Sequence, residues 1–90
     1  MELKDTIEMM TSKDYKERFK AEYYQTKIRY DKLKDFNNKI KAAIMTRHCE
    51  NKVTMPVHDC PDELLFEQQN SMGRYLQILE VRAKIEGIEL

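Results

Sequence analysis

Apolar side chains recur between residues 19 and 44 at alternating spacings of four and three. The positions are Phe19, Tyr23, Thr26, Tyr30, Leu33, Asn37, Ile40 and Ile44. No glycine or proline interrupts the chain before Pro56, so this heptad pattern predicts one amphipathic helix. A helix of about 30 to 35 residues is about 45 to 52 Å long at 1.5 Å per residue.

A second stripe with the same spacing follows Pro61. It contains Leu65, Gln69, Met72, Leu76, Leu79, Ala83, Glu86 and Leu90. Proline suits the first position of a helix, and Asp62 and Glu63 favour the positive end of its dipole. Gly73 is the weak point of this pattern, and Gly87 is expected to end the helix.

The first residues predict a short additional helix, because Leu3, Ile7 and Met10 share one helical face. Thr11 is expected to cap the following helix, with Asp14 returning the bond as in a capping box. The chain is therefore predicted to be a single all-α domain, a short helix followed by a long antiparallel helical hairpin. The expected bounds are about 2–10 for the short helix, 12–46 for the long helix, 47–60 for the loop and 61–87 for the last helix.

The hairpin has more apolar side chains than two narrow stripes can bury. Those off the stripes are Tyr24, Ile28, Phe36, Met45, Leu64, Phe66, Tyr75, Ile78, Val81 and Ile85. Each large apolar side chain contributes about 1.5 to 3 kcal/mol when buried, so we predict a homo-oligomer. The alternative is that the short first helix folds back and covers this surface.

The stripes also contain polar residues, among them one amide in each stripe. Asn37 occupies an a-type position, where a buried amide lowers stability but penalises wrong registers. Gln69 is its natural partner in one antiparallel register, which also places Ile40 beside Leu65 and Tyr30 beside Leu76.

Composition narrows the possible partners. The 16 lysines and arginines balance 16 aspartates and glutamates, so binding to duplex DNA or RNA or to an anionic membrane is disfavoured. The sequence shows neither a secretory signal nor a stretch long enough to span a bilayer, which predicts a cytoplasmic protein. Cys49 and Cys60 are then expected to be reduced thiols.

No pattern predicts catalysis or a cofactor. The residues His48, Cys49, His58 and Cys60 form pairs that are too closely spaced for a usual zinc site, so we expect no metal. Nothing in the sequence supplies an orienting group or an oxyanion site for a thiol nucleophile. Phosphate-loop, dinucleotide, zinc-protease and serine-hydrolase motifs are all missing, and we expect no enzyme.

Aromatic and basic side chains alternate on the long predicted helix. Tyr23, Lys27 and Tyr30 share a face, with Tyr24 and Arg29 beside them, and Arg74 with Tyr75 forms a similar pair on the last helix. Planar rings stack on bases for about 1 to 3 kcal/mol each, and cations hold phosphates, so this pattern suits a nucleotide. Tyrosines at this spacing are also typical of a helical core.

Two longer segments carry a family resemblance. The runs D-T-I-E-M-M-T-S-x-D-Y-K-E-R-F-K-A-E-Y-Y-Q-x-K-I-R-Y-x-K-L and Y-L-x-I-L-E-x-R-A-K-I-E-G, with C-P between them, resemble small helical proteins of phages and prophages related to a crAss-like phage protein. The loop from His48 to Val57 departs from that pattern by its length. The resemblance implies a viral origin and supplies no catalytic motif.

The layout is also similar to the hairpin sponges with which phages sequester signalling nucleotides of the CBASS and Thoeris defences. This resemblance implies an anti-defence protein of the bacterial host cytoplasm that binds a cyclic oligonucleotide or a cyclic ADP-ribose isomer without cleaving it. The implied ligand-binding residues are Tyr15, Tyr23, Tyr24, Lys27, Arg29 and Arg74, from the same or a neighbouring chain. The alternatives are an interaction module that inhibits a host defence protein, and a structural helical oligomer.

Overall fold

The computed structural model describes residues 1–90 and is entirely helical. A 3-10 helix, η1 (Leu3–Thr6), continues into α1 (Ile7–Met10), which is followed by α2 (Tyr15–Thr46) and α3 (Asp62–Glu86). The molecule is elongated, with extents of 54 × 25 × 21 Å. The all-α prediction and the helical hairpin are therefore confirmed, and none of the helices is both long and apolar enough to span a membrane.

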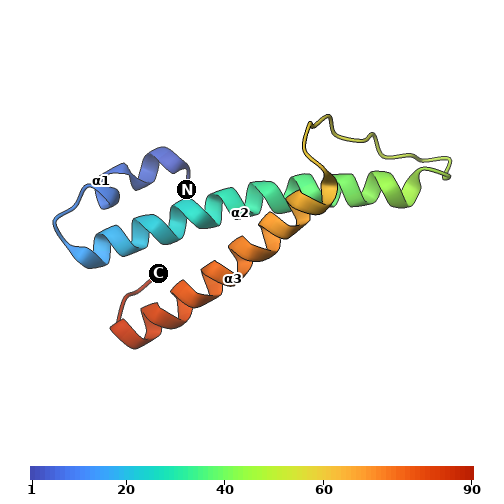
Figure 1. Ribbon diagram of the computed structural model, residues 1–90. Helices are drawn as coiled ribbons and strands as arrows, with labels where there is room; N and C mark the ends of the chain where they lie inside the picture. The colour runs from blue at the N-terminus through green and yellow to red at the C-terminus, as the bar shows by residue number, and fades with distance from the viewer.

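The helix α2 is the axis of the structure, and the other helices pack along it (Figure 1). The helix α3 runs back along α2 at an oblique angle, so that the two helices diverge toward the end of α3. The short helices η1 and α1 fold back on the N-terminal half of α2, where the Gln25 amide donates to the Thr6 hydroxyl at 2.9 Å. The fold-back considered as an alternative to self-association is thus present, but it covers α2 and leaves α3 free.

The cap of α2 lies at Asp14, and the prediction of a cap at Thr11 is wrong. The Asp14 carboxylate accepts a hydrogen bond from the backbone N–H of Lys16 at 3.0 Å. Thr11 instead ends α1, with its hydroxyl donating to the carbonyl oxygen of Ile7 at 2.9 Å. Thr11 and Asp14 both have side-chain oxygens that can bond to backbone groups at a helix end. The turn between α1 and α2 places Thr11 at the end of α1 and Asp14 at the start of α2.

The main core lies where α2, α3 and the last residues of the chain meet. It consists of Phe19, Tyr23, Leu76, Leu79, Ala83 and Ile88. The sequence stripe placed Leu90 in this core, but Leu90 is 39% exposed whereas Ile88 is 6% exposed. The heptad count fails here because Gly87 adopts the left-handed conformation, with a φ of 70°, and turns the chain back between the helices.

The predicted pairing of Asn37 with Gln69 is confirmed. The Asn37 side chain is fully buried, and its Nδ2 donates to Gln69 Oε1 at 2.9 Å and to the carbonyl oxygen of Leu65 at 3.1 Å. The Asn37 Oδ1 atom has no hydrogen-bond partner. These two bonds join α2 and α3 near the loop end of the hairpin.

One face of α3 remains uncovered. Ile78, Val81 and Ile85 are 42%, 54% and 79% exposed, and we call these three residues the outer stripe. Together with Arg74 they keep the four and three spacing of a helical seam. The outer stripe faces away from α2, so no part of the chain buries it.

Candidate functional site

The cavity beside Tyr23 is the site in this chain that best combines an aromatic ring, a cation and free space. Its volume is about 770 Å³, and it lies beside the end of α3 and the residues that follow it. The lining residues are Tyr23, Glu80, Ala83, Lys84, Gly87, Ile88, Glu89 and Leu90. One wall is therefore the buried tyrosine of α2, another is α3, and the third is the turn after α3.

The Tyr23 hydroxyl is held by a carboxylate from the other helix. It donates to Glu80 Oε2 at 2.7 Å, and burial together with this bond raises the pKa of Tyr23 to about 12. The Tyr24 ring meets the Tyr23 ring edge to face, with centroids 5.2 Å apart. Tyr23 is thus a fixed, neutral and largely buried side chain that lines the cavity, and Tyr24 packs against its ring.

Two further pairs of tyrosine and glutamate join α2 and α3. The Tyr15 hydroxyl donates to Glu86 at 2.9 Å and accepts from Arg82 at 2.6 Å, and the Tyr75 hydroxyl donates to Glu22. The hydrogen bond to Glu86 raises the pKa of Tyr15. These bonds position the ends of the helices around the cavity, and they engage Tyr15 outside it.

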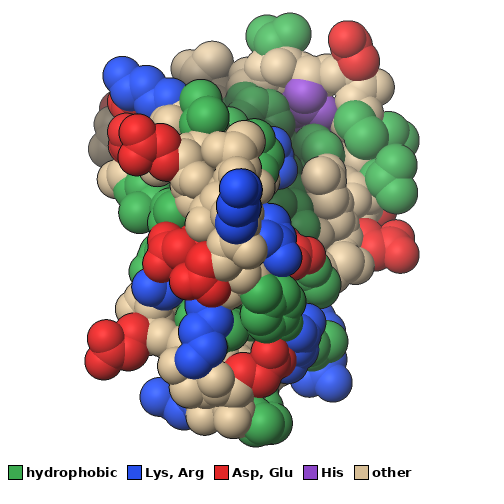
Figure 2. Space-filling view, turned by 90° about the vertical axis from the view of Figure 1, so that its left-hand side faces the viewer, with side chains coloured by type: hydrophobic (Ala, Val, Ile, Leu, Met, Phe, Trp, Pro, Cys, Tyr) green, Lys and Arg blue, Asp and Glu red, His purple; other side chains and the backbone are tan.

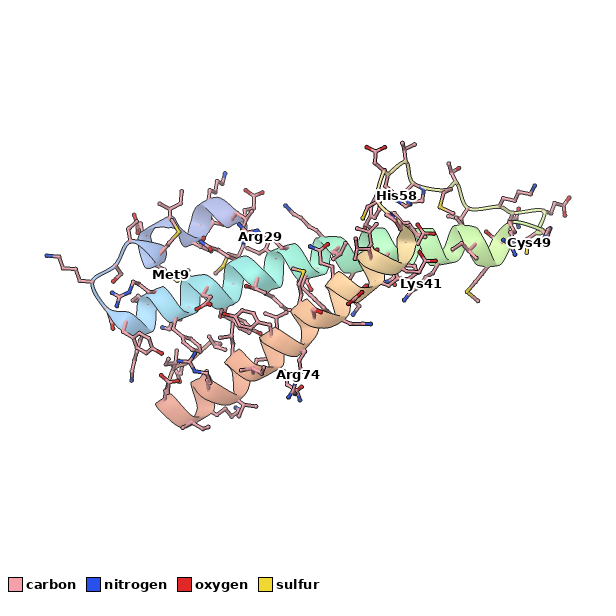
Figure 3. All side chains as sticks on the ribbon, in the orientation of Figure 1. Met9, Arg29, Lys41, Cys49, His58 and Arg74 are labelled. Atoms are coloured by element: carbon pink, nitrogen blue, oxygen red, sulfur yellow. The ribbon has the colours of Figure 1, made fainter.

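Two of the predicted cations pair with groups other than Tyr23. Lys27 pairs with Asp31 at 3.0 Å and lies 5.6 Å from the centre of the Tyr30 ring. Arg29 and Arg74 lie on opposite sides of the helical pair in Figure 3. Arg74 donates to Gln77 at 3.0 Å along its own helix. Within one chain, the structure brings together only Tyr23 and Tyr24 of the six predicted residues.

Sequence reasoning missed the residues that complete the cavity. Glu80 and Lys84 lie one turn apart on α3, and both resembled solvated helix-surface charges in the sequence. The signal that could have found them was Gly87, because a helix-ending glycine followed by an isoleucine predicts a chain that turns back. Such a turn must enclose the last turn of the helix.

A second cavity, of about 450 Å³, lies on the other side of that turn. Its lining residues are Asp14, Lys16, Glu17, Lys20, Gly87, Ile88 and Glu89. The Lys16 amine donates to the carbonyl oxygen of Gly87 at 3.5 Å, and the Lys20 amine lies 3.3 Å from a Glu17 oxygen. The cations of this region thus come from the first turns of α2, upstream of Tyr23.

The surface at this end of the molecule has no region of a single charge sign. Figure 2 shows lysine and arginine side chains interspersed with aspartate and glutamate, and apolar side chains between them. Recognition of an anion here depends on individual lysines at short range, since a broad field is missing.

The loop that contains the histidines and cysteines lies at the end of α2 remote from Met9, as the labelled His58 and Cys49 show (Figure 3). His58 Nδ1 lies 2.7 Å from the carbonyl oxygen of Cys60, and His58 Nε2 lies 3.0 Å from Asp62. The His58 ring also meets Phe36 edge to face at 5.6 Å. His58 therefore anchors the loop to the hairpin, and no group of three or more potential metal ligands is formed.

Comparison with known proteins gives one family. Neither curated proteins nor solved structures gave a match. The model of the family described as Sequestin matches residues 13–85, which include α2, the loop and nearly all of α3. The name denotes sequestration, in agreement with the resemblance to sponges, while the resemblance to crAss-like phage proteins stays a prediction. Since the match extends over far more than half of its residues, the chain belongs to the Sequestin family.

Proposed function

We propose that this chain is a phage-encoded anti-defence protein that binds and sequesters a signalling nucleotide without cleaving it, in the cytoplasm of the bacterial host. The nucleotide is of the cyclic oligonucleotide or cyclic ADP-ribose type. The observation that carries the proposal is the cavity beside Tyr23, in a chain whose family name denotes sequestration.

The chemistry of the cavity suits the parts of a nucleotide. The Tyr23 ring offers a planar apolar wall for a base, and such stacking contributes about 1 to 3 kcal/mol. The Lys84 amine supplies a cation for a phosphate. Carboxylates of Glu80 and Glu89 accept hydrogen bonds from ribose hydroxyls or exocyclic amines.

The proposal includes a homo-oligomer. The outer stripe on α3 leaves three branched apolar side chains in water, and a second copy of the chain would bury them. Arg74, which lies in the same seam, would then contact a neighbouring chain. This explains how Arg74 can contribute to a ligand site although it does not approach Tyr23 in its own chain.

The outer stripe also favours a second candidate, an interaction module that docks this face onto a host defence protein. The two candidates differ in their response to small molecules. A sponge gains stability from its ligand, by about 2.7 kcal/mol at 100 times the dissociation constant. A docking module gains none.

Thermal unfolding in the presence of cyclic dinucleotides, cyclic trinucleotides and cyclic ADP-ribose isomers tests the proposal. We expect a Tm increase with one class, and a reduced increase in Lys84→Met. Lys39→Met is the matched control, because Lys39 pairs with Asp35 on the α2 surface. A panel without any shift, at concentrations far above those in infected cells, would refute sequestration.

A further inference from the structure

The last four residues form a strap held by a small number of contacts. In this strap, residues 87–90, the Gly87 and Ile88 amides both donate to the carbonyl oxygen of Ala83, the second at 2.8 Å. The Ile88 side chain inserts into the core, whereas Glu89 and Leu90 are exposed. One buried side chain and one helix-ending turn thus hold the segment in place.

The strap lies between two cavities and lines both of them. Gly87, Ile88 and Glu89 line both the 770 Å³ cavity beside Tyr23 and the 450 Å³ cavity beside Lys16. The first cavity has the aromatic wall and Lys84, and the second has Lys16 and Lys20. The first cavity therefore has an aromatic ring but only one lysine, from α3. The second cavity has two lysines from α2 but no aromatic ring.

The strap also occupies a cation. The Lys16 amine donates to the carbonyl oxygen of Gly87 at 3.5 Å, a long contact to a neutral acceptor. A phosphate oxygen is a stronger acceptor for an ammonium group than a backbone carbonyl is, because the bond is then charge-assisted on both sides. An anion that reaches this position can therefore displace the carbonyl.

We propose that residues 87–90 are a displaceable strap, and that a phosphate of the ligand takes the place of the Gly87 carbonyl at Lys16. Displacement joins the two cavities into one trough in which Lys16, Lys20 and Lys84 surround Tyr23. Four carboxylates line the two cavities. Glu89 leaves with the strap, and Glu17 stays beside Lys20 at 3.3 Å. Glu80 and Asp14 stay as well, and they accept hydrogen bonds from the Tyr23 hydroxyl and from the backbone N–H of Lys16. The nucleotide identity of the ligand rests on the proposed function, whereas the strap and the anion position rest on the contacts described above.

Hydrogen exchange of the Ile88 amide reports the strap directly, since that N–H is bonded to Ala83 only while the turn is closed. The probe is inorganic pyrophosphate, followed by NMR on the full chain. We expect saturation with pyrophosphate to shift signals of Lys16, Lys20 and Lys84 and to accelerate exchange at Ile88. Lys16→Met should abolish both effects, and Lys39→Met should retain them.

A variant at Gly87 tests the displacement of the strap while all three lysines stay unchanged. Gly87→Ala forces a side chain into a left-handed φ of 70°, and its Cβ would meet no atom within 4 Å, so only the turn is strained. We expect the open population, and with it the apparent affinity for pyrophosphate, to rise about five- to thirtyfold. Ser71→Ala, an exposed change on α3, should alter neither.

The proposal is overturned if pyrophosphate leaves the Ile88 amide as protected as before, if it binds away from the three lysines, or if Gly87→Ala binds it no better than the unaltered chain. These outcomes are separable from the proposed function. A nucleotide that raises Tm while Ile88 stays protected retains sequestration and removes the strap. If pyrophosphate opens the strap but no nucleotide stabilises the chain, the strap proposal is retained and sequestration is rejected.

Discussion

Replacing Asn37 with leucine should stabilise the hairpin, although the amide makes two hydrogen bonds. Asn37 is fully buried, and its Oδ1 has no partner, a state that costs about 1 to 3 kcal/mol. Leucine removes that cost and adds an apolar side chain worth about 1.5 to 3 kcal/mol when buried. Asn37→Leu therefore has two favourable effects on the free energy of unfolding.

The unfavourable effects of Asn37→Leu on the free energy of unfolding are smaller than these gains. Two hydrogen bonds, to Gln69 and to the Leu65 carbonyl, disappear at about 1 kcal/mol each. Gln69 is half-buried, so its freed amide can turn toward water. Fitting the branched leucine between the helices also carries some strain. We expect a net gain of about 1 kcal/mol, which corresponds to a Tm increase of about 4 to 8 °C in a domain of this size.

The assay is thermal unfolding by circular dichroism, together with the native mass of the assembly. Asn38→Leu is the matched control, since Asn38 is exposed and its replacement should change stability by no more than about 0.5 kcal/mol. If the amide sets the register, the more stable Asn37→Leu variant should also populate additional assemblies. A Tm that falls by several degrees, in a variant with a single native mass, would refute this reasoning.

Three further perturbations follow from the same structure. Ile40→Ala should lower the free energy of unfolding by about 2 to 5 kcal/mol, because Ile40 is fully buried, and urea unfolding measures this loss. Burial raises the pKa of Tyr23 from 10.0 to about 12, so its contribution to stability is complete below pH 10 and is lost as the pH rises toward 12. Tyr23→Phe should remove this alkaline loss, which spectrophotometric titration of the tyrosines and unfolding at each pH will show. Hydrogen bonds from Tyr15 and Arg82 lower the pKa of Glu86 below its ordinary 4.5, so its contribution is present above that value and is lost as the pH falls through the lowered one. Glu86→Gln should therefore flatten the dependence of Tm on acid pH, and an unchanged acid profile would contradict this assignment.

The helical period was sufficient to predict the hairpin. An uninterrupted stripe of four and three spacings specifies a helix wherever it occurs, and two such stripes joined by a loop specify an antiparallel pair. The pairing of Asn37 with Gln69 followed from the same logic, because each stripe has a polar residue where the other one does. These features depend on spacing alone, which a single sequence contains in full.

The candidate site was harder to predict, because it depends on the helix ends, where the regular spacing of apolar residues stops. Asp14 and Gly87 determine where α2 begins and where the chain turns back, and neither of them belongs to a stripe. Once the chain turns at Gly87, Ile88 replaces Leu90 in the core, and the strap lines one cavity together with Lys84. Composition and spacing do not reveal which charged residues such a turn brings together.

The predicted cations illustrate a second limit. Lys27, Arg29 and Arg74 lie near aromatic residues in the sequence, but helical residues one or two positions apart do not face each other, and a cation one turn away can pair with another side chain. Lys27 pairs with Asp31, and the two arginines lie on opposite sides of the helical pair. Proximity to Tyr23 is obtained instead by Lys84, whose partner helix no local pattern identifies.

The central claim is that this chain retains an intact nucleotide in the cavity beside Tyr23. Mass spectrometry of the small molecules released by heat from the protein, purified out of bacteria in which a nucleotide-signalling defence is active, tests it most directly. We predict that one uncleaved signalling nucleotide is released, and that Lys84→Met releases much less of it than Lys39→Met does. Release of no nucleotide, or of a hydrolysed product, would contradict the account.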